Sequence, residues 1–457
     1  MRLIQKNTVF LQSNSNFKTY MNLFWKKLFG QLHSTARFEQ DEKDALADMQ
    51  RYYAVEKSVE LAEYRELFHI VKSAKFKENK KILQNRRYRD TEESRDWRKL
   101  EKLQKNSAIR QYYNTAESEP LKLFLTFKES HEYELLGNPK EVKMSERLKN
   151  FKNYERSKEY KNYVRFHNSY IIKELKDLQA KVAAPEFKRA NDFWANPHRW
   201  ETTPEYAQEQ RFYSLAKSPD IVFFNNETPE RFKKYHERTL TFSQEFDCTT
   251  LPLVWKAGFH YVAQQLIGNH SFANEKQANN NGKNIAVEDG ILKIHTHHEH
   301  IKATAWDVKK GFIEKEFDYT SDVINTAESF RQECGIFQAK IRCSGNIHHA
   351  FWLGADRKLP HVNIFHFDGN KITVGNASRE SFDRTVIKGI TRLLPFVYTL
   401  VWNKNELVWY INNIEVYRTS ANIPKEKLYL AFNSFISSNQ TGSTGLLEVD
   451  WVKVYKI

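Results

Sequence analysis

The chain has few cysteines and no long apolar run. Its 457 residues include only three cysteines, Cys248, Cys334 and Cys343, which excludes a disulfide scaffold and a four-cysteine zinc site. Cys334 and Cys343 fall on one predicted extended segment, which holds them ~30 Å apart, so we expect free thiols. No apolar stretch approaches the ~18 residues that a transmembrane helix needs, so we predict no membrane span.

Glycine and charge divide the chain near residue 236. Gly30 and Gly137 are the only glycines before that position, and the other thirteen follow it. Residues 1–235 hold 46 Lys+Arg against 34 Asp+Glu, a balance of +12, whereas residues 236–457 hold 25 against 23, a balance of +2. We therefore predict a basic leader or arm over 1–38, a charged α-helical repeat region over 39–235 and a β domain over 236–457.

The leader contains no acidic residue before Glu39. It also lacks the apolar core of a secretory signal peptide. Its acid-free, basic character fits either a mitochondrial presequence or a basic arm whose first helix carries apolar residues at helical spacing, and we favour the arm. The apolar residues are Phe17, Tyr20, Leu23, Phe24 and Leu28. A virion or the cytoplasm is the favoured location, with mitochondrial import as the alternative.

The helical half repeats a short phrase in which Ser or Pro is followed by polar residues and then an apolar one. Such a phrase predicts a helix start, because Ser or Thr caps free N–H groups and Pro suits the first turn. The sequence also repeats over a longer distance: residues 87–112 align with residues 199–224, and Thr91 matches Thr203. We predict stacked short helices in an irregular repeat array. The phrases are KSAKF (72–76), KNSAI (105–109), RSKEY (156–160), APEF (184–187), TPEY (203–206) and SPDI (218–221).

Three roles fit this helical half. It is either a spacer with a solvated charged face, or a surface that binds protein partners and mediates assembly, or a nucleic-acid-binding region. The basic residues are interleaved with acids and form no single basic stripe, which disfavours nucleic acid.

After Phe242 the hydrophobic period changes to two, with Gly, Asn and Asp turns between the runs. This pattern predicts an all-β sandwich or jelly roll, so that the whole chain is an α-helical repeat region followed by a β domain. The clearest runs are ILKIHTH (291–297), FQAKIRC (337–343), YTLVWN (398–403), ELVWYIN (406–412) and LLEVDWVKVYKI (446–457).

Seven segments in order along the β half carry a family resemblance. They are FSQEFD (242–247), NIAVEDGILKI (284–294), CGIFQAKIR (334–342), HHAFWLG (348–354), PHVNIFHFDG (360–369), YTLVWNKNELVWYINNIEVYR (398–418) and EVDWVKVY (448–455). With these segments, residues 240–457 resemble glycoside hydrolase family 16, the laminarinase- and agarase-like enzymes with a concanavalin-type jelly roll. The resemblance implies that fold and an ancestry in polysaccharide hydrolysis. The pairing of a charged helical repeat with such a domain is also similar to proteins of Bacteroidota and their crAss-like phages.

The family's catalytic strand carries Glu-x-Asp-x-x-Glu, and here all three carboxylates are replaced. His361, Asn363 and His366 stand at the three positions. Residues i and i+2 share one face of a strand, and a bulge returns i+5 to that face. A retaining hydrolase needs a carboxylate nucleophile and a carboxylic acid/base. We therefore predict that the fold is kept, that hydrolysis is lost and that no catalytic residue remains.

The same strand and its neighbour could still hold a sugar. We predict that His349, Trp352, His361, Asn363 and His366 form a carbohydrate-binding set, because amides, imidazoles and an aromatic ring hydrogen-bond and stack on a glycan. The competing interpretations are a rigid building block with a vestigial groove and an altered catalytic site.

Histidines are frequent enough in the β half for a metal site to be weighed. His295 and His297 share one strand face, and His361 and His366 could converge with His348 or His349. Surface or hydrogen-bonded histidines are the commoner case, so we predict neither a metal nor any other cofactor.

Together these features predict an inactive family-16-like protein that serves as a carbohydrate-binding or structural module. The expected partners are a polysaccharide for the β half and proteins for the helical half. One alternative is an active or repurposed glycoside hydrolase cleaving β-glucan or galactan. Another is a pure scaffold subunit of a virion or organellar complex.

Overall fold

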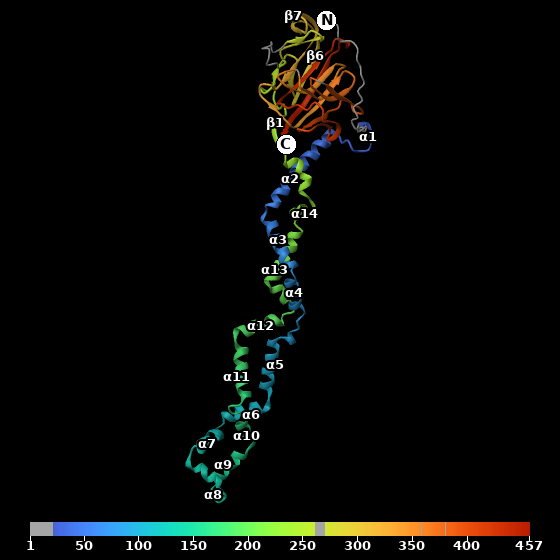
Figure 1. The fold of residues 1–457 in the computed structure, drawn as a ribbon. Helices are drawn as coiled ribbons and strands as arrows, with labels where there is room; N and C mark the ends of the chain where they lie inside the picture. The colour runs from blue at the N-terminus through green and yellow to red at the C-terminus, as the bar shows by residue number, and fades with distance from the viewer. Residues whose placement is uncertain (1–21, 261–269, 358, 380) are drawn as a thin grey trace. The chain divides into compact units, whose positions relative to one another are not determined.

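The computed structural model describes residues 22–260, 270–357, 359 to 379 and 381–457. The chain forms two compact units, one comprising Met1–Tyr52 and Glu227–Ile457 and the other comprising Tyr53–Asn226. We call them the β unit and the helical unit. Figure 1 shows that strands fill the β unit and helices the helical unit, which confirms the predicted fold class.

The helical unit is a long hairpin of short helices. Outgoing helices pair with returning ones in nested order: α3 with α13, α5 with α11, and α6 with α10 (Figure 1). The outgoing arm contains α3 (Val59–Lys72), α4 (Ala74–Asn85), η1 (Tyr88–Asp90), α5 (Glu92–Lys105) and α6 (Ser107–Ala116). The turn of the hairpin contains α7 (Glu119–Lys128), η2 (His131–Gly137), α8 (Pro139–Met144) and α9 (Glu146–Arg156). The returning arm contains α10 (Lys158–Phe166), α11 (Tyr170–Ala183), α12 (Pro185–Ala195), η3 (Arg199–Thr202), α13 (Pro204–Ala216) and α14 (Pro219–Asn226).

All six repeated phrases begin helices, as predicted. Ser73 and Ser157 accept the amide protons of Phe76 and Tyr160, each at 3.1 Å. Proline is the first residue of α12, α13 and α14. One detail of the prediction was wrong: in KNSAI the cap is Asn106, whose amide oxygen accepts two backbone N–H groups, and Ser107 is already helical.

The long-range register is also real. Thr91 and Thr203 each follow a short 3-10 turn and cap the next helix through Oγ1, which accepts an amide proton at 3.2 Å in both cases. The structure thus repeats a turn, a threonine cap and a helix in the two arms. Equal local sequence gives equal local structure, because the cap satisfies the same free N–H groups.

The β unit is a sandwich of two sheets. Sheet A has the path β17-β16-β15-β10-β19-β6-β7-β4, with β1, β3 and β5 paired beside it, and sheet B has the path β14-β13-β12-β11-β18-β8-β2, with β9 beside β18. The strands of sheet A are β1 (Thr239–Gln244), β3 (Ser271–Phe272), β4 (Gln277–Asn279), β5 (Ile285–Glu288), β6 (Ile291–Asp307), β7 (Gly311–Ser321), β10 (Gly335–Ser344), β15 (Phe396–Trp402), β16 (Leu407–Ile411), β17 (Ile414–Thr419) and β19 (Gly445–Lys456). Those of sheet B are β2 (Lys256–Ala257), β8 (Val323–Asn325), β9 (Arg331–Gln332), β11 (His348–Gly354), β12 (His361–Asp368), β13 (Ile372–Ala377), β14 (Phe382–Ile387) and β18 (Leu428–Phe435).

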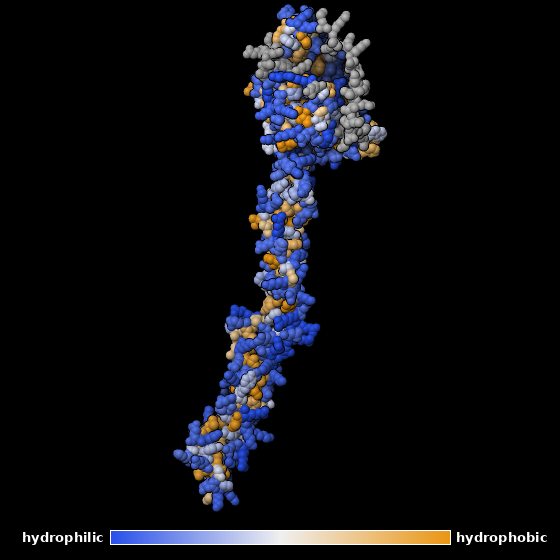
Figure 2. Space-filling model, in the orientation of Figure 1, coloured by the Kyte–Doolittle hydropathy of each residue, from blue (hydrophilic) through white to orange (hydrophobic). Residues whose placement is uncertain are grey.

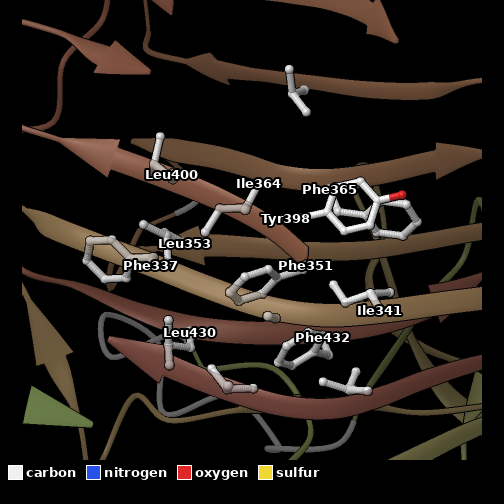
Figure 3. Packing of buried hydrophobic residues seen from close by; sticks show 14 of the residues in the cluster. Phe337, Ile341, Phe351, Leu353, Ile364, Phe365, Tyr398, Leu400, Leu430 and Phe432 are labelled. Atoms are coloured by element: carbon white, nitrogen blue, oxygen red, sulfur yellow. The ribbon is translucent and has the colours of Figure 1, made fainter. Parts of the chain in front are cut away.

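The core of the sandwich lies between the two sheets. Figure 3 shows Phe337 and Ile341 of β10 near Phe351 of β11 and Phe432 of β18, all essentially inaccessible to solvent. Rings of Phe351 and Phe432 stack with centroids 4.5 Å apart. Alternate residues of each strand fill this space, so the remaining residues of sheet B point away from the core.

Part of the region before residue 53 packs on the sandwich. Leu23 of α1 (Leu23–Leu28) belongs to the sandwich core, whereas Phe24 and Leu28 are exposed. Thr35, the first residue of α2 (Thr35–Glu56), donates its hydroxyl to the Pro395 carbonyl at 2.6 Å. α15 (Pro229–His236) leads from the helical unit into β1. Of the predicted leader helix, Phe17 and Tyr20 lie outside the described residues.

The boundaries between the two compact units fall at residues 52/53 and 226/227. The sequence predicted boundaries near residues 38 and 235. At the first boundary, the difference arises because the first turns of α2 bind the sandwich through charged side chains. The Glu39 carboxylate accepts hydrogen bonds from Lys340 at 3.0 Å and from the Trp451 indole at 2.7 Å. Composition cannot distinguish a helix that packs on a sheet from one that packs on other helices.

Candidate carbohydrate-binding face

A bulge in β12 brings the three replaced positions to one side of sheet B. Pairing with β13 shifts register between Asn363 and His366, and the intervening Ile364 and Phe365 are both buried. His361, Asn363 and His366 are half-buried and point away from the core. The indole of Trp409 donates to the Asn363 carbonyl at 2.9 Å, which fixes the bulge from the core side.

The first group on this face surrounds Trp352. Its indole stacks on the His361 ring with centroids 4.8 Å apart and donates to Asn433 Oδ1 of β18 at 3.0 Å. His361 Nε2 in turn lies 3.0 Å from Asn363 Oδ1. Four side chains from β11, β12 and β18 thus form a connected row with a half-buried aromatic ring.

The second group is a pair of histidines. His348 Nδ1 and His366 Nε2 share a hydrogen bond of 3.0 Å, and Phe435 stacks on His348 with centroids 4.2 Å apart. Burial, together with the neighbouring His348, lowers the pKa of His366 to about 4. Burial also lowers the pKa of His348. At neutral pH both rings are therefore uncharged hydrogen-bonding groups.

His349 does not belong to this face, and its prediction as a sugar-binding residue is corrected. Its side chain is fully buried on the core side of β11, where its ring contacts Ser434 Oγ at 2.8 Å and the Ser344 carbonyl at 2.9 Å. The cause is strand alternation. His348 lies two residues before Ala350 and four before Trp352, so it shares their face, whereas the side chain of His349 points to the opposite face.

The predicted carbohydrate-binding set lacks three members of this face. His348 was considered only as a metal ligand beside His366, although the period of two, counted back from Trp352, places it on the same face. Asn433 and Phe435 lie some eighty residues away along the chain, and only the pairing of β18 with β11 places them here. No local pattern gives that strand order.

Two carboxylates lie near the ends of these strands, and Asp368 is opposite His348 in the pairing of β11 with β12. Asp368, at the end of β12, accepts the backbone N–H groups of Asn370 and Lys371 at 3.0 and 2.8 Å. Asp356, after β11, pairs with Arg331 at 2.6 Å. The face therefore offers stacking and hydrogen bonding from its described residues, without a carboxyl pair at the three positions His361, Asn363 and His366.

The histidines that the sequence singled out as possible metal ligands occur in pairs. His295 and His297 do share a face, with stacked rings 5.2 Å apart. Across the ranges that the structure describes, no three ligating side chains lie close enough together to hold a metal ion. The three cysteines, all described, are free thiols.

Two proteins of one bacterium are similar in sequence to this chain. An endo-1,3-1,4-beta-glycanase, ExsH of Rhizobium meliloti (strain 1021), is 26% identical over 287 residues, which cover 53% of this chain and 58% of ExsH. EglC from the same organism, with the same description, is 26% identical over 287 residues and is covered to 59%. The chain thus spans under two thirds of the length of these relatives. No protein-family model matches the chain.

Two solved structures align with about half of the chain. The laminarinase catalytic domain of Thermotoga maritima MSB8 aligns with a TM-score of 0.40 at 17% identity, covering 48% of this chain and 99% of that domain. SCLam, a non-specific endo-beta-1,3(4)-glucanase from family GH16, aligns with a TM-score of 0.39 at 19% identity, covering 48% of this chain and 91% of its own.

The sandwich, its bulged β12 and the curated relatives agree with the resemblance seen in the sequence. The β unit is a jelly roll similar to that of glycoside hydrolase family 16. None of the helices in the described ranges is both long and apolar enough to cross a membrane.

Proposed function

We propose that the β unit binds a polysaccharide on the outer side of sheet B without hydrolysing it. The observation that carries this proposal is the row of Trp352, His361, Asn363 and Asn433, which joins an aromatic ring to polar groups where a hydrolase needs carboxylates. Neutral amides and imidazoles hydrogen-bond sugar hydroxyls, and none of them replaces a carboxylate nucleophile.

The proposed ligand is a β-glucan with 1,3 and 1,4 linkages. The support is the description of both curated relatives as endo-1,3-1,4-beta-glycanases. An indole packs its flat face against the apolar face of a sugar ring, while the N–H group at the edge of the indole donates a hydrogen bond. Here Asn433 already holds the indole N–H, so Trp352 is fixed in one orientation before the ligand arrives.

The test is a binding assay of the full chain on soluble mixed-linkage β-glucan, with reducing-end release measured in the same samples. We expect binding without release. Trp352→Ala should weaken binding about tenfold, or about 1.4 kcal/mol, as expected for loss of one stacked ring. Trp97→Ala is the matched control, because Trp97 is an exposed tryptophan of α5 in the helical unit.

Each result has a defined meaning. Reducing-end release that His361→Ala abolishes would establish the alternative, a repurposed hydrolase. Absence of binding by the unaltered chain would leave the sandwich as a building block. A loss of binding in Trp352→Ala supports the proposal only if the far-ultraviolet circular dichroism spectrum of the variant chain is unchanged.

We further propose that the helical unit mediates assembly with protein partners. Large apolar side chains are exposed around the turn of its hairpin, namely Leu123 of α7, Met144 of α8 and Val164 of α10. Exposed apolar groups of this kind are typical of interaction surfaces. Sedimentation of the full chain tests self-assembly: a concentration-dependent rise in mass that Leu123→Lys reduces would support it, and a monomer at all concentrations would refute self-assembly.

A further inference from the structure

A hollow on the helical unit is lined by an unusual number of lysines. It lies between α4 and α13 and has a volume of about 260 Å³. Lys72, Lys77, Lys80 and Lys81 line it, with Glu209 as the sole acid among the lining residues. Figure 2 shows a mainly hydrophilic surface over the helical unit, so a polar hollow is in keeping with its surroundings.

One of the four lysines is neutralised inside the unit. Lys80 Nζ lies 2.6 and 2.7 Å from the two carboxylate oxygens of the buried Glu209. The same ammonium lies over the Trp200 ring, 5.3 Å from its centroid. This pair serves the packing of α4 against α13, and it adds no net charge to the hollow.

The other three lysines are not neutralised by a carboxylate among the described residues. The Lys72 ammonium lies over the Phe212 ring, 5.3 Å from its centroid, and keeps its charge. Lys72, Lys77 and Lys81 are exposed and form no ion pair with any residue in the described part of the chain. Lys77 and Lys81 are four residues apart on one helix and therefore project from the same face. The hollow carries an excess of three positive charges above a floor that includes the buried Val71 and Phe76.

A second hollow on the same unit holds its cations differently. It is lined by Arg89, Asp90, Arg95 and Arg98. There Arg95 donates to the Thr91 carbonyl at 3.3 Å and Arg98 to the Ser94 carbonyl at 3.1 Å. Those cations are engaged by the backbone of their own helix, whereas the three lysines of the first hollow are not.

We propose that the hollow between α4 and α13 binds an organic sulfate or phosphate monoester. Lysine ammonium groups are compact charges that attract tetrahedral oxyanions without demanding one orientation. The volume approaches the lower end of small-molecule sites, roughly 300 Å³, so it exceeds what a bare oxyanion fills. Tyr213 and Gln84 add hydroxyl and amide donors for the organic part, and Phe76 adds an apolar surface.

The test is calorimetric titration of the full chain with glucose 6-sulfate and glucose 6-phosphate, with inorganic sulfate and phosphate as comparison ligands. We expect the esters to bind more tightly than the inorganic ions, and added sodium chloride to weaken binding, because the contacts are exposed charges. The double variant Lys77→Gln/Lys81→Gln should weaken ester binding about tenfold or more. The sulfate and phosphate arms identify which ester the site prefers.

The matched control is Lys149→Gln/Lys188→Gln, which removes two exposed lysines from α9 and α12 of the same unit, neither of them in an ion pair with a described residue. Equal weakening in both double variants would show general charge attraction and overturn the proposal. So would equal affinity for inorganic ions and esters, or no binding at all. Glucan binding through Trp352 is measured on the same proteins and should not change, so failure of either proposal is seen separately.

Discussion

Acid should destabilise the β unit through His349, and the size of the effect follows from its surroundings. The ring is fully buried between Ser434 and the Ser344 carbonyl, and burial lowers its pKa to about 3. In the unfolded chain a histidine titrates at about 6.5. Between these values the unfolded state binds one more proton than the folded state, so stability falls as the pH falls.

The expected magnitude is about 2 kcal/mol between pH ~7.5 and ~5, since each pH unit below the unfolded pKa costs about 1.4 kcal/mol. The variant His349→Gln keeps a polar side chain at the site but does not titrate. The unaltered chain should therefore lose about 2 kcal/mol more than the variant over this range. Other groups, including His348 and His366, titrate in both proteins and cancel in the difference.

The assay is hydrogen exchange of the central strands β10 and β19 at each pH, in graded denaturant, because this reports opening of the sandwich separately from the helical unit. A matched variant, His300→Gln, alters an exposed histidine of β6 and should behave like the unaltered chain. If His349→Gln and the unaltered chain lost equal stability on acidification, the buried, neutral state assigned to His349 would be refuted.

Two further predictions concern buried polar contacts. Asn412 is buried, accepts the Val397 amide proton at 2.9 Å and donates to Thr35 Oγ1 at 3.0 Å. The variant Asn412→Ala should therefore lower the free energy of unfolding by about 2 kcal/mol. It should also increase amide hydrogen exchange at the start of α2, measured by mass spectrometry. Lys80→Gln leaves Glu209 buried without its cation and should destabilise the helical unit by about 3 kcal/mol, followed by thermal loss of helical circular dichroism. The double change Lys80→Gln/Glu209→Gln should recover most of that loss, and a lack of recovery would contradict the role assigned to the pair.

Much of the helical unit was determined by its sequence. Helix starts depend on side chains within three residues of the free N–H groups, and Ser73, Ser157 and Thr203 cap helices where the phrases predicted. The equivalent Thr91 and Thr203 were likewise found by comparing the chain with itself. The pairing of arms was not predicted, since equally amphipathic short helices do not specify which helix packs on which.

The sequence also determined the two-sheet fold and the face of His361, Asn363 and His366, because alternation and one bulge are local properties of a strand. It did not determine which neighbours share that face. Asn433 and Phe435 reach Trp352 and His348 only through the pairing of β18 with β11, which also brings Ser434 to the inward-pointing ring of His349. Contacts between residues far apart in the chain depend on strand order, which the long-range packing of the sandwich decides.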